Sequence, residues 1–472
     1  MMIEQRCIEF IPYHERYGTP KRLFTIWFSA NLQVTTLVVG TLGIVAGLNL
    51  IWTIIALSVG SVVGTIFMAA HSAQGPHLGI PQMIQSRAQF GVVGAALPML
   101  MVVFTYVLFI AANGIVMREA VQAVTPMSDD RALIAFGAAS LIIAFIGYEL
   151  IHRLGALLTL ASGVLFLAAA WRVLDLPMPE HAWSLTDTYR MAPFLLVVSQ
   201  SASYALGFGP YVADYSRYLP HDIRTRDTFL FTYSGNLAGS LMIMILGALM
   251  AALMSGGARA IALDPASSIA GLFGGGRVFI YTVVILGVLL VNVLNVYSAF
   301  MSVVVIFAGW RKVLEISRLR KFIIMLAVVA IATAVAIFTQ YRFFAYFSDI
   351  LMAQIYVLVP WSSINLTDYY LTRKGHYSVP DIFDEQGIYG RINWMTVGVY
   401  VLAIILQIPF MSLSFYKGPI AQLVGTDLSW IPGLAVPGGL YYLFMRARTH
   451  APGPVETAAP VAGTSDEASG PG

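Results

Sequence analysis

The residues of this chain that could do chemistry are polar side chains set inside apolar segments. Residues 199–220, SQSASYALGFGPYVADYSRYLP, place serines and glycines in the middle of an apolar stretch of membrane length. Asn292 and Asn295 interrupt a run of valine and leucine. An amide in such surroundings is costly unless it is hydrogen-bonded. The pattern therefore indicates either ligand binding or hydrogen bonds between neighbouring helices.

The sequence lacks the patterns that accompany catalysis or metal binding. No HExxH, P-loop, GxSxG or paired intramembrane carboxylates occur, and the eight histidines are dispersed. Cys7 is the only cysteine, which excludes intrachain disulfides and a CxxC metal site. We therefore predict no enzyme, no metal site and no cofactor.

The composition is that of an integral membrane protein. Hydrophobic residues make up 58% of the 472 residues and charged residues only 11%, against about 25% charged in soluble domains. The net charge of +3 is too small and too scattered to indicate a nucleic-acid partner. The first 22 residues are too polar for the apolar core of a cleaved signal peptide, so we expect the first membrane helix to be retained.

Apolar runs of about 20 residues predict an all-α protein with twelve transmembrane helices. The predicted spans are 24–48, 51–71, 92–117, 132–148, 155–174, 191–211, 229–254, 278–310, 322–339, 344–370, 394–413 and 428–445. We divide the chain into a cytoplasmic segment (1–23), a membrane domain that holds the twelve helices (24–447) and a disordered cytoplasmic tail (448–472) rich in Ala, Pro, Gly and Ser.

The distribution of Lys and Arg predicts the orientation. If both termini are cytoplasmic, 19 of the 27 basic residues fall on the inner side and 8 on the outer side. This positive-inside bias supports an even number of spans. It predicts that both ends lie inside the cell, and we expect the membrane to be the cell's inner (plasma) membrane.

Spans one and six both contain interruptions. Span one holds the polar run Asn31, Gln33, Thr35 and Thr36 before two glycines, and span six holds residues 199–209. An offset of five spans predicts that helices one to five and six to ten form two inverted repeats, with two helices appended. Broken helices at matching positions predict a binding site at the bilayer midplane. Close helix packing through Gly and Ser is the alternative explanation.

Five motifs resemble the nucleobase:cation symporter family, whose members carry cytosine, purines, uracil, allantoin, hydantoins or thiamine. They are GPHLGIPQMIQSRAQFG at 75–91, DYSRYLP at 214–220, NVLNVYSAF at 292–300, PWSSINLTDYYLTRKGHY at 360–377 and DIFDEQGIYGRINW at 381–394. The resemblance covers nearly the whole chain, in order. It implies a LeuT-like fold of twelve helices with helices one and six interrupted.

The resemblance implies a secondary active transporter that imports a nucleobase, cytosine or a purine, by alternating access with ion symport. Such a carrier would act as a monomer. Permeases for allantoin or hydantoin, uracil or thiamine are alternatives within the family. A transport-like receptor or a channel is the alternative from another class. A channel would show rings of like residues around a pore, whereas this chain has one asymmetric set of amides.

Family members hold a flat heterocycle between aromatic rings and hydrogen-bond its edge with amides, hydroxyls and backbone groups. The resemblance places Ser203, Tyr204 and Ala205 in the unwound part of helix six. Helix three would supply rings from Phe104, Tyr106 and Phe109 and an amide from Asn113. The predicted substrate-binding residues are Asn31, Gln33, Tyr106, Asn113, Ser203, Tyr204, Ala205, Asn292 and Asn295.

Charged pairs mark the inner ends of two helices. Asp214 and Arg217 are candidates for an inner gate, in which Asp214 would pair with the loop around Arg87; interfacial anchoring is the alternative. Asp368 and Arg373 form a similar pair at the end of helix ten.

The coupling ion is predicted to be H+ rather than Na+. Sodium-coupled relatives use helix-one carbonyls and two adjacent hydroxyl side chains in helix eight, and those positions here are Leu289 and Leu290. The candidate proton carrier is Asp349 in the outer half of helix ten, since burial favours a protonated acid. Pairing of Asp349 with Arg342 is the alternative.

Overall fold

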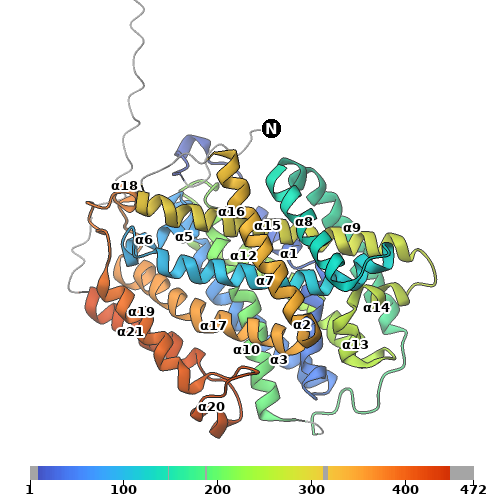
Figure 1. Cartoon of the computed structure of the whole chain (residues 1–472). Helices are drawn as coiled ribbons and strands as arrows, with labels where there is room; N and C mark the ends of the chain where they lie inside the picture. Colours follow the sequence, from blue (N-terminus) through green and yellow to red (C-terminus); the bar gives the residue numbers. More distant parts are fainter. Residues whose placement is uncertain (1–8, 147, 187–188, 312–316, 447–472) are drawn as a thin grey trace, which may run out of the picture.

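The computed structural model describes residues 9–146, 148–186, 189–311 and 317–446. The first eight residues and the predicted tail at 448–472 lie outside the described residues. Across the described residues the chain is helical, with a single antiparallel bridge between Ser412 and Lys417. Figure 1 shows the helices packed side by side in one bundle.

Each predicted span coincides with a helix or a pair of helices. They are α1 (Lys21–Ala30) with α2 (Val34–Val45), α3 (Leu50–Ser72), α7 (Ala96–Val124), α8 (Asp129–Ile146), α9 (Tyr148–Leu174), α10 (Met191–Leu206), α12 (Thr225–Leu253), α15 (Arg277–Arg311), α16 (Arg318–Thr339), α17 (Phe343–Thr367), α19 (Trp394–Gln407) and α21 (Trp430–Met445). By length and apolar composition alone, seven helices in the described part qualify as spans, or eight if α1 and α2 count as one.

Short helices fill the connections between these long ones. They are α4 (Gln74–Leu78), α5 (Gln82–Gln85), α6 (Arg87–Phe90), α11 (Val212–Ser216), α13 (Gly257–Leu263), α14 (Pro265–Gly271), α18 (Val379–Phe383) and α20 (Pro419–Val424). In Figure 1, α5, α6 and α18 lie at one end of the bundle and α13 and α14 at the opposite end.

The interruption of the first span lies where the sequence predicts it. Helix α1 ends at Ala30 and α2 begins at Val34, and the two helices are bent by 65°. Gln33 takes an extended conformation, with φ −144° and ψ 158°, as the residue before α2. The polar run at Asn31 and Gln33 therefore coincides with backbone that leaves the helix.

The interruption of the sixth span begins later than predicted. Ser203, Tyr204 and Ala205 lie in the last regular turn of α10, and the helix continues to Leu206. The backbone then passes through a 3₁₀ turn, η2 (Gly209–Tyr211), into α11. Two features explain the shift. Pro210 lacks an N–H to continue the helix, and the Ser203 hydroxyl donates to the carbonyl of Leu351 on α17 rather than to its own helix.

The packing of the helices follows the symmetry of a 5+5 inverted repeat, in which each span corresponds to the one five places later. Spans two and six, α3 and α10, lie side by side, and so do their counterparts, span seven (α12) and span one (α1 and α2). Span three (α7) contacts span ten (α17), and correspondingly span eight (α15) contacts span five (α9). The structure therefore has the LeuT-like arrangement predicted from the sequence.

Both repeats bring backbones together through glycines. A Cβ at Gly60 or Gly64 of α3 would collide with backbone atoms of α10, at Val198 and Ala202. On the corresponding helix α12, a Cβ at Gly239 would collide with the backbone of α1 at Phe28. Small residues at helix contacts allow close packing where no hydrophobic effect drives association in lipid.

Loops that the sequence assigns to one side of the membrane contact one another. At the predicted outer side, the Asn49 amide donates to the carbonyl of Ser184 (2.7 Å), and Arg118 donates to Gln340 (2.9 Å). At the predicted inner side, the backbone N–H groups of Val92 and Val93 donate to Gly390 and Arg391. The grouping of the loops agrees with the predicted alternation of the spans.

The N-terminal segment packs against the same inner loops. The backbone N–H of Ile11 donates to the carbonyl of Gly79 (2.9 Å), and that of Tyr17 to Tyr218 (2.7 Å). Arg16 is buried and donates to the carbonyls of Ile11 and Pro76. Burial lowers the pKa of its guanidinium to about 10, so Arg16 stays charged at neutral pH. The segment thus joins the loop after α3 to the end of α11.

The predicted pair of Asp368 and Arg373 is present at the end of α17. Arg373 Nε lies 3.2 Å from the Asp368 carboxylate, which is fully buried. Gln89, Tyr377 and Tyr441 also donate to that carboxylate, at 2.7 to 2.8 Å. A buried carboxylate is tolerated when it is paired and its remaining lone pairs are satisfied. Asp368 therefore joins the end of α17 to α6, to the loop that follows α17 and to α21.

Candidate functional site

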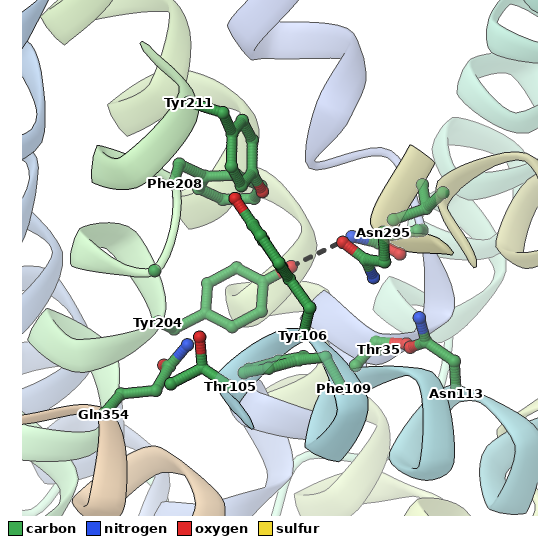
Figure 2. Close-up of a pocket in the computed structure, with 13 residues that line it drawn as sticks. Thr35, Thr105, Tyr106, Phe109, Asn113, Tyr204, Phe208, Tyr211, Asn295 and Gln354 are labelled. Atoms are coloured by element: carbon green, nitrogen blue, oxygen red, sulfur yellow. Dashed lines mark hydrogen bonds between the residues drawn. The ribbon is translucent and has the colours of Figure 1, made fainter. Parts of the chain in front are cut away.

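A small internal cavity, the central cavity, lies where the two interrupted spans meet. Its volume is about 30 Å³, room for about two water molecules. Five of the nine predicted binding residues line it: Gln33, Tyr106, Asn113, Tyr204 and Asn295. The other lining residues are Thr35, Thr105, Phe109, Gly207, Phe208, Tyr211, Val291 and Gln354. Figure 2 shows the labelled side chains converging on this space from different helices.

The phenol of Tyr204 connects the two interrupted spans. Its oxygen lies 2.6 Å from the Thr36 hydroxyl and accepts a hydrogen bond from Gln33 Nε2 at 3.2 Å. Tyr204 lies one turn before the break in span six, and Gln33 forms the break in span one. The hydroxyl is therefore committed to helix one, while the Tyr204 ring remains part of the cavity wall.

Two amides of the cavity retain groups for a ligand. The Gln33 Oε1 atom is buried and has no hydrogen-bond partner among the described residues. The Asn295 side chain, which is 8% exposed, likewise has no recorded hydrogen bond within that part of the chain. A buried polar group without a partner calls for a bound water or ligand. Gln33 thus offers an acceptor, and Asn295 offers both a donor and an acceptor.

Two further amides are committed to a polar chain beside the cavity. The Thr35 hydroxyl donates to Asn113 Oδ1 at 2.8 Å, and Asn113 Nδ2 donates to Asn292 Oδ1 at 3.3 Å. Asn292 then donates to the Ser140 hydroxyl of α8 at 2.9 Å. Asn113 therefore lines the cavity, but both ends of its amide already have hydrogen-bond partners. Asn292 lies outside the cavity and links α15 to α7 and α8.

Aromatic rings supply the flat walls. Tyr204 and Phe208 meet edge to face at 5.6 Å, and Phe208 meets Tyr211 in the same way at 5.9 Å. Tyr106 of α7 lies 5.8 Å from Tyr211 with an interplanar angle of 38°. Phe109 also lines the cavity, one turn further along α7. Phe104, which we expected on this platform, is instead 48% exposed on the outer surface of the bundle.

Three more predicted residues, besides Asn292, lie outside the wall. Asn31 donates to the carbonyl of Trp27 (2.8 Å) and to Asn236 Oδ1 of α12 (2.9 Å), which turns it away from the cavity. Ser203 faces α17, where its hydroxyl also lies 3.3 Å from Gln354 Oε1. Ala205 is fully buried and is not part of the wall.

Sequence reasoning missed several residues of the cavity. Phe208 lies inside the predicted interruption at 199–209 but is not among the predicted binding residues, and Tyr211 lies just beyond that interruption. Gln354 comes from α17, where no family motif drew attention to it. A glutamine in the middle of an apolar span was the available signal. Thr105 and Val291 gave no signal of their own, because each differs little from its neighbours along a membrane helix.

The candidate gate residues lie at the inner end of span six. Asp214 accepts a hydrogen bond from the backbone N–H of Gln82 at 2.7 Å, so it does contact the loop that contains Arg87. Arg87 donates to the carbonyl of Val305 on α15 (3.1 Å). Arg217 donates to the Tyr218 hydroxyl (3.2 Å) and to the carbonyl of Glu9 (3.5 Å). The structure thus ties α11 to the inner loop and to the N-terminal segment.

Asp349 lies near the outer end of α17. Its Oδ1 accepts from the backbone N–H of Ser414 at 2.8 Å, and its Oδ2 accepts from the Ser414 hydroxyl. It therefore holds the connection between α19 and α20. This contact accounts for both oxygens of the carboxylate.

The cavity has the chemistry of a binding site. Within the described residues, no group of three or more His, Cys, Asp or Glu side chains could hold a metal ion. The wall consists of neutral amides, hydroxyls and rings, which match a flat molecule with donors and acceptors on its edge. The cavity must widen to admit one, because its present volume suits only water.

Comparisons with known sequences agree with this chemistry. Residues 10–433 match the family model described as permease for cytosine/purines, uracil, thiamine, allantoin. A Bacillus subtilis protein named "Putative purine-cytosine permease YxlA" is 40% identical over 95% of this chain and 97% of its own length. The purine-cytosine permease fcyB of Emericella nidulans is 25% identical over 94% of this chain and 88% of its own.

Solved structures share the fold. Mhp1, a nucleobase-cation-symport-1 family transporter crystallised in a closed conformation with bromovinylhydantoin bound, superposes with a TM-score of 0.72 at 18% identity, covering 94% of this chain and 95% of its own. Its inward-facing conformation gives a TM-score of 0.69. From its motifs, its fold and these matches, this chain belongs to the permease family for cytosine/purines, uracil, thiamine and allantoin, and is a multi-pass membrane transporter rather than an enzyme.

Proposed function

We propose that this permease imports a nucleobase, cytosine or a purine, by alternating access coupled to an ion gradient. The observation that carries the proposal is the central cavity, where the uncommitted amide groups of Gln33 and Asn295 face a wall of aromatic rings. A nucleobase has two π faces for stacking and an edge of donors and acceptors for the amides. The names of the curated relatives support the same class of substrate.

Orientation and assembly belong to the same proposal. Both termini face the cytoplasm and the protein lies in the inner (plasma) membrane, as the 19 to 8 distribution of basic residues supports. The N-terminal segment contacts the inner loops, which is consistent with this orientation. We propose that the transporter acts as a monomer, which is consistent with a central cavity lined by residues of one chain.

Counterflow in proteoliposomes tests the function. Vesicles loaded with unlabelled cytosine should transiently accumulate external labelled cytosine above equilibrium, because a carrier exchanges substrate across the membrane. A competition panel of adenine, hypoxanthine, uracil, allantoin, hydantoin and thiamine then identifies the preferred substrate. Binding without counterflow would indicate a receptor, and flux that ignores internal substrate would indicate a channel.

The amide of Asn295 should contribute directly to affinity. In Asn295→Ala we expect the dissociation constant for the base to rise about tenfold or more, since one lost hydrogen bond and an unpaired edge group cost about 1 to 3 kcal/mol. Equilibrium binding of labelled base to the purified protein measures this dissociation constant.

The matched control is Asn236→Ala. Asn236 is fully buried and forms hydrogen bonds with Asn31 and Thr65 away from the cavity. Its removal should lower the melting temperature and leave the dissociation constant within about threefold. Normal affinity in both Asn295→Ala and Gln33→Ala would place the substrate elsewhere.

We propose further that the coupling ion is H+ and that Asp349 carries it. The positions of helix eight that hold hydroxyl ligands in sodium-coupled relatives are Leu289 and Leu290 here, or Leu286 and Gly287 if Asn292 rather than Asn295 is the matching residue, and neither register supplies a hydroxyl. Protonation of Asp349 would weaken its two contacts with Ser414, since a neutral carboxyl accepts hydrogen bonds less strongly. Binding of a proton would thereby be linked to movement of the outer loop.

Uptake at a fixed membrane potential should therefore rise with an inward proton gradient and be unchanged when choline replaces sodium. Asp349→Asn should abolish accumulation driven by the proton gradient while counterflow persists, because exchange needs no net proton movement. Ser414→Ala removes the hydroxyl contact but keeps the carboxylate and its bond from the Ser414 backbone N–H, so it should keep proton-driven accumulation. Stimulation of the wild type by sodium would refute proton coupling, and accumulation by Asp349→Asn would assign the proton to another group.

A further inference from the structure

A second cavity adjoins the central cavity on its inner side. It has a volume of about 110 Å³, nearly four times that of the central cavity. Its wall includes five tyrosines, Tyr106, Tyr211, Tyr215, Tyr218 and Tyr297, and we call it the tyrosine cavity. Tyr106 and Tyr211 belong to the walls of both cavities.

The two cavities follow one another along the same helices. On α15 the central cavity uses Val291 and Asn295, and the tyrosine cavity uses residues from Leu294 to Val305. On span six the central cavity ends at Tyr211, and the tyrosine cavity continues through Asp214 to Tyr218. On both elements the residues that line the tyrosine cavity lie closer to the inner loops than those that line the central cavity. The tyrosine cavity therefore stands on the path between the central cavity and that end.

The rings of Tyr106 and Tyr211 form the partition. Their centroids are 5.8 Å apart, which leaves no passage for a flat molecule between them. Tyr106 lies within the regular helix α7, whereas Tyr211 lies in the break of span six with φ −133° and ψ 10°. A change in the break would move Tyr211 relative to Tyr106. The partition can thus open without unfolding a helix.

The lining of the tyrosine cavity suits the same kind of molecule as the central cavity. Tyr218 is held in place by Arg217, whose guanidinium carbon lies 5.1 Å from the ring centroid. The hydroxyls of Ser298 and Ser302 lie one turn apart on α15 and can pair with polar edge groups. Stacking of a base on an aromatic side chain strengthens its binding by about 5- to 150-fold and tolerates any base.

We propose that the tyrosine cavity is a second, weaker binding site for a flat aromatic heterocycle, occupied by the substrate after it passes the pair of Tyr106 and Tyr211. The proposal rests on the proposed function, because it takes the same substrate class. The central cavity supplies the uncommitted amides and binds tightly. The tyrosine cavity supplies rings and hydroxyls, with Asp214 and Arg217 also in its wall, but it has no buried amide, so its affinity is lower.

Equilibrium dialysis of the full-length purified protein with labelled cytosine, and separately with labelled adenine, tests the proposal. The wild type should bind two equivalents of its preferred base per chain, with dissociation constants at least tenfold apart. Asn295→Ala should weaken only the tight equivalent. Ser302→Trp, which fills the tyrosine cavity, should remove only the weak one.

A second variant tests the proposal if Ser302→Trp fails to fold. Tyr297→Leu removes one ring and retains most of the side-chain volume, and it should weaken the weak equivalent by about fivefold or more. A single equivalent in the wild type overturns the proposal and leaves the proposed function standing. Two equivalents that both persist in Ser302→Trp and Tyr297→Leu overturn it as well. No binding of either base to the folded protein counts against both.

Discussion

The structure depends on one constraint, which is that backbone leaving a helix inside a membrane must find other partners. The two interrupted spans meet this constraint together. The Gln33 side chain donates to the backbone carbonyl of Ala30 at the end of α1 (3.3 Å) and to the Tyr204 phenol of the sixth span, which Thr36 also contacts. The contact fixes the two breaks side by side at the middle of the bundle. The central cavity lies between the two breaks, where neither span continues as a regular helix.

The same amide chemistry serves two purposes around that cavity. Asn113, Asn236 and Asn292 form hydrogen bonds with one another or with hydroxyls and hold helices together. Asn31 donates to Asn236, although its own Oδ1 has no partner among the described residues. Gln33 and Asn295 retain unpaired groups that face the cavity. In a low-dielectric interior an unpaired amide is costly. Its retention is explained if a ligand supplies the missing partner.

Much of this arrangement could be predicted from the sequence, and the limits have physical causes. Apolar run length located the helices because lipid sets their length, and the polar run at Asn31 and Gln33 located the first break. Which amides bond to other helices and which face the cavity could not be predicted. Asn292 and Asn295 lie on the same helix, and only the structure shows what each one faces. Gln354 was missed for the same reason. The break in span six was placed too early because the family resemblance set it at Ser203 to Ala205, whereas Ser203 bonds to α17 and the helix continues to Leu206.

The central claim is that substrate occupies the cavity between the two breaks, and protection of a cysteine there tests it most directly. Val291 lines this cavity. Leu286 lies on the same helix but is 38% exposed on the surface of the protein. With Cys7 replaced by serine, Val291→Cys and Leu286→Cys can each be titrated with a membrane-permeant maleimide. The account predicts that the base slows alkylation of Val291→Cys, with half-protection at its dissociation constant, and leaves Leu286→Cys unaffected. Equal alkylation of Val291→Cys with and without a base that binds would contradict it.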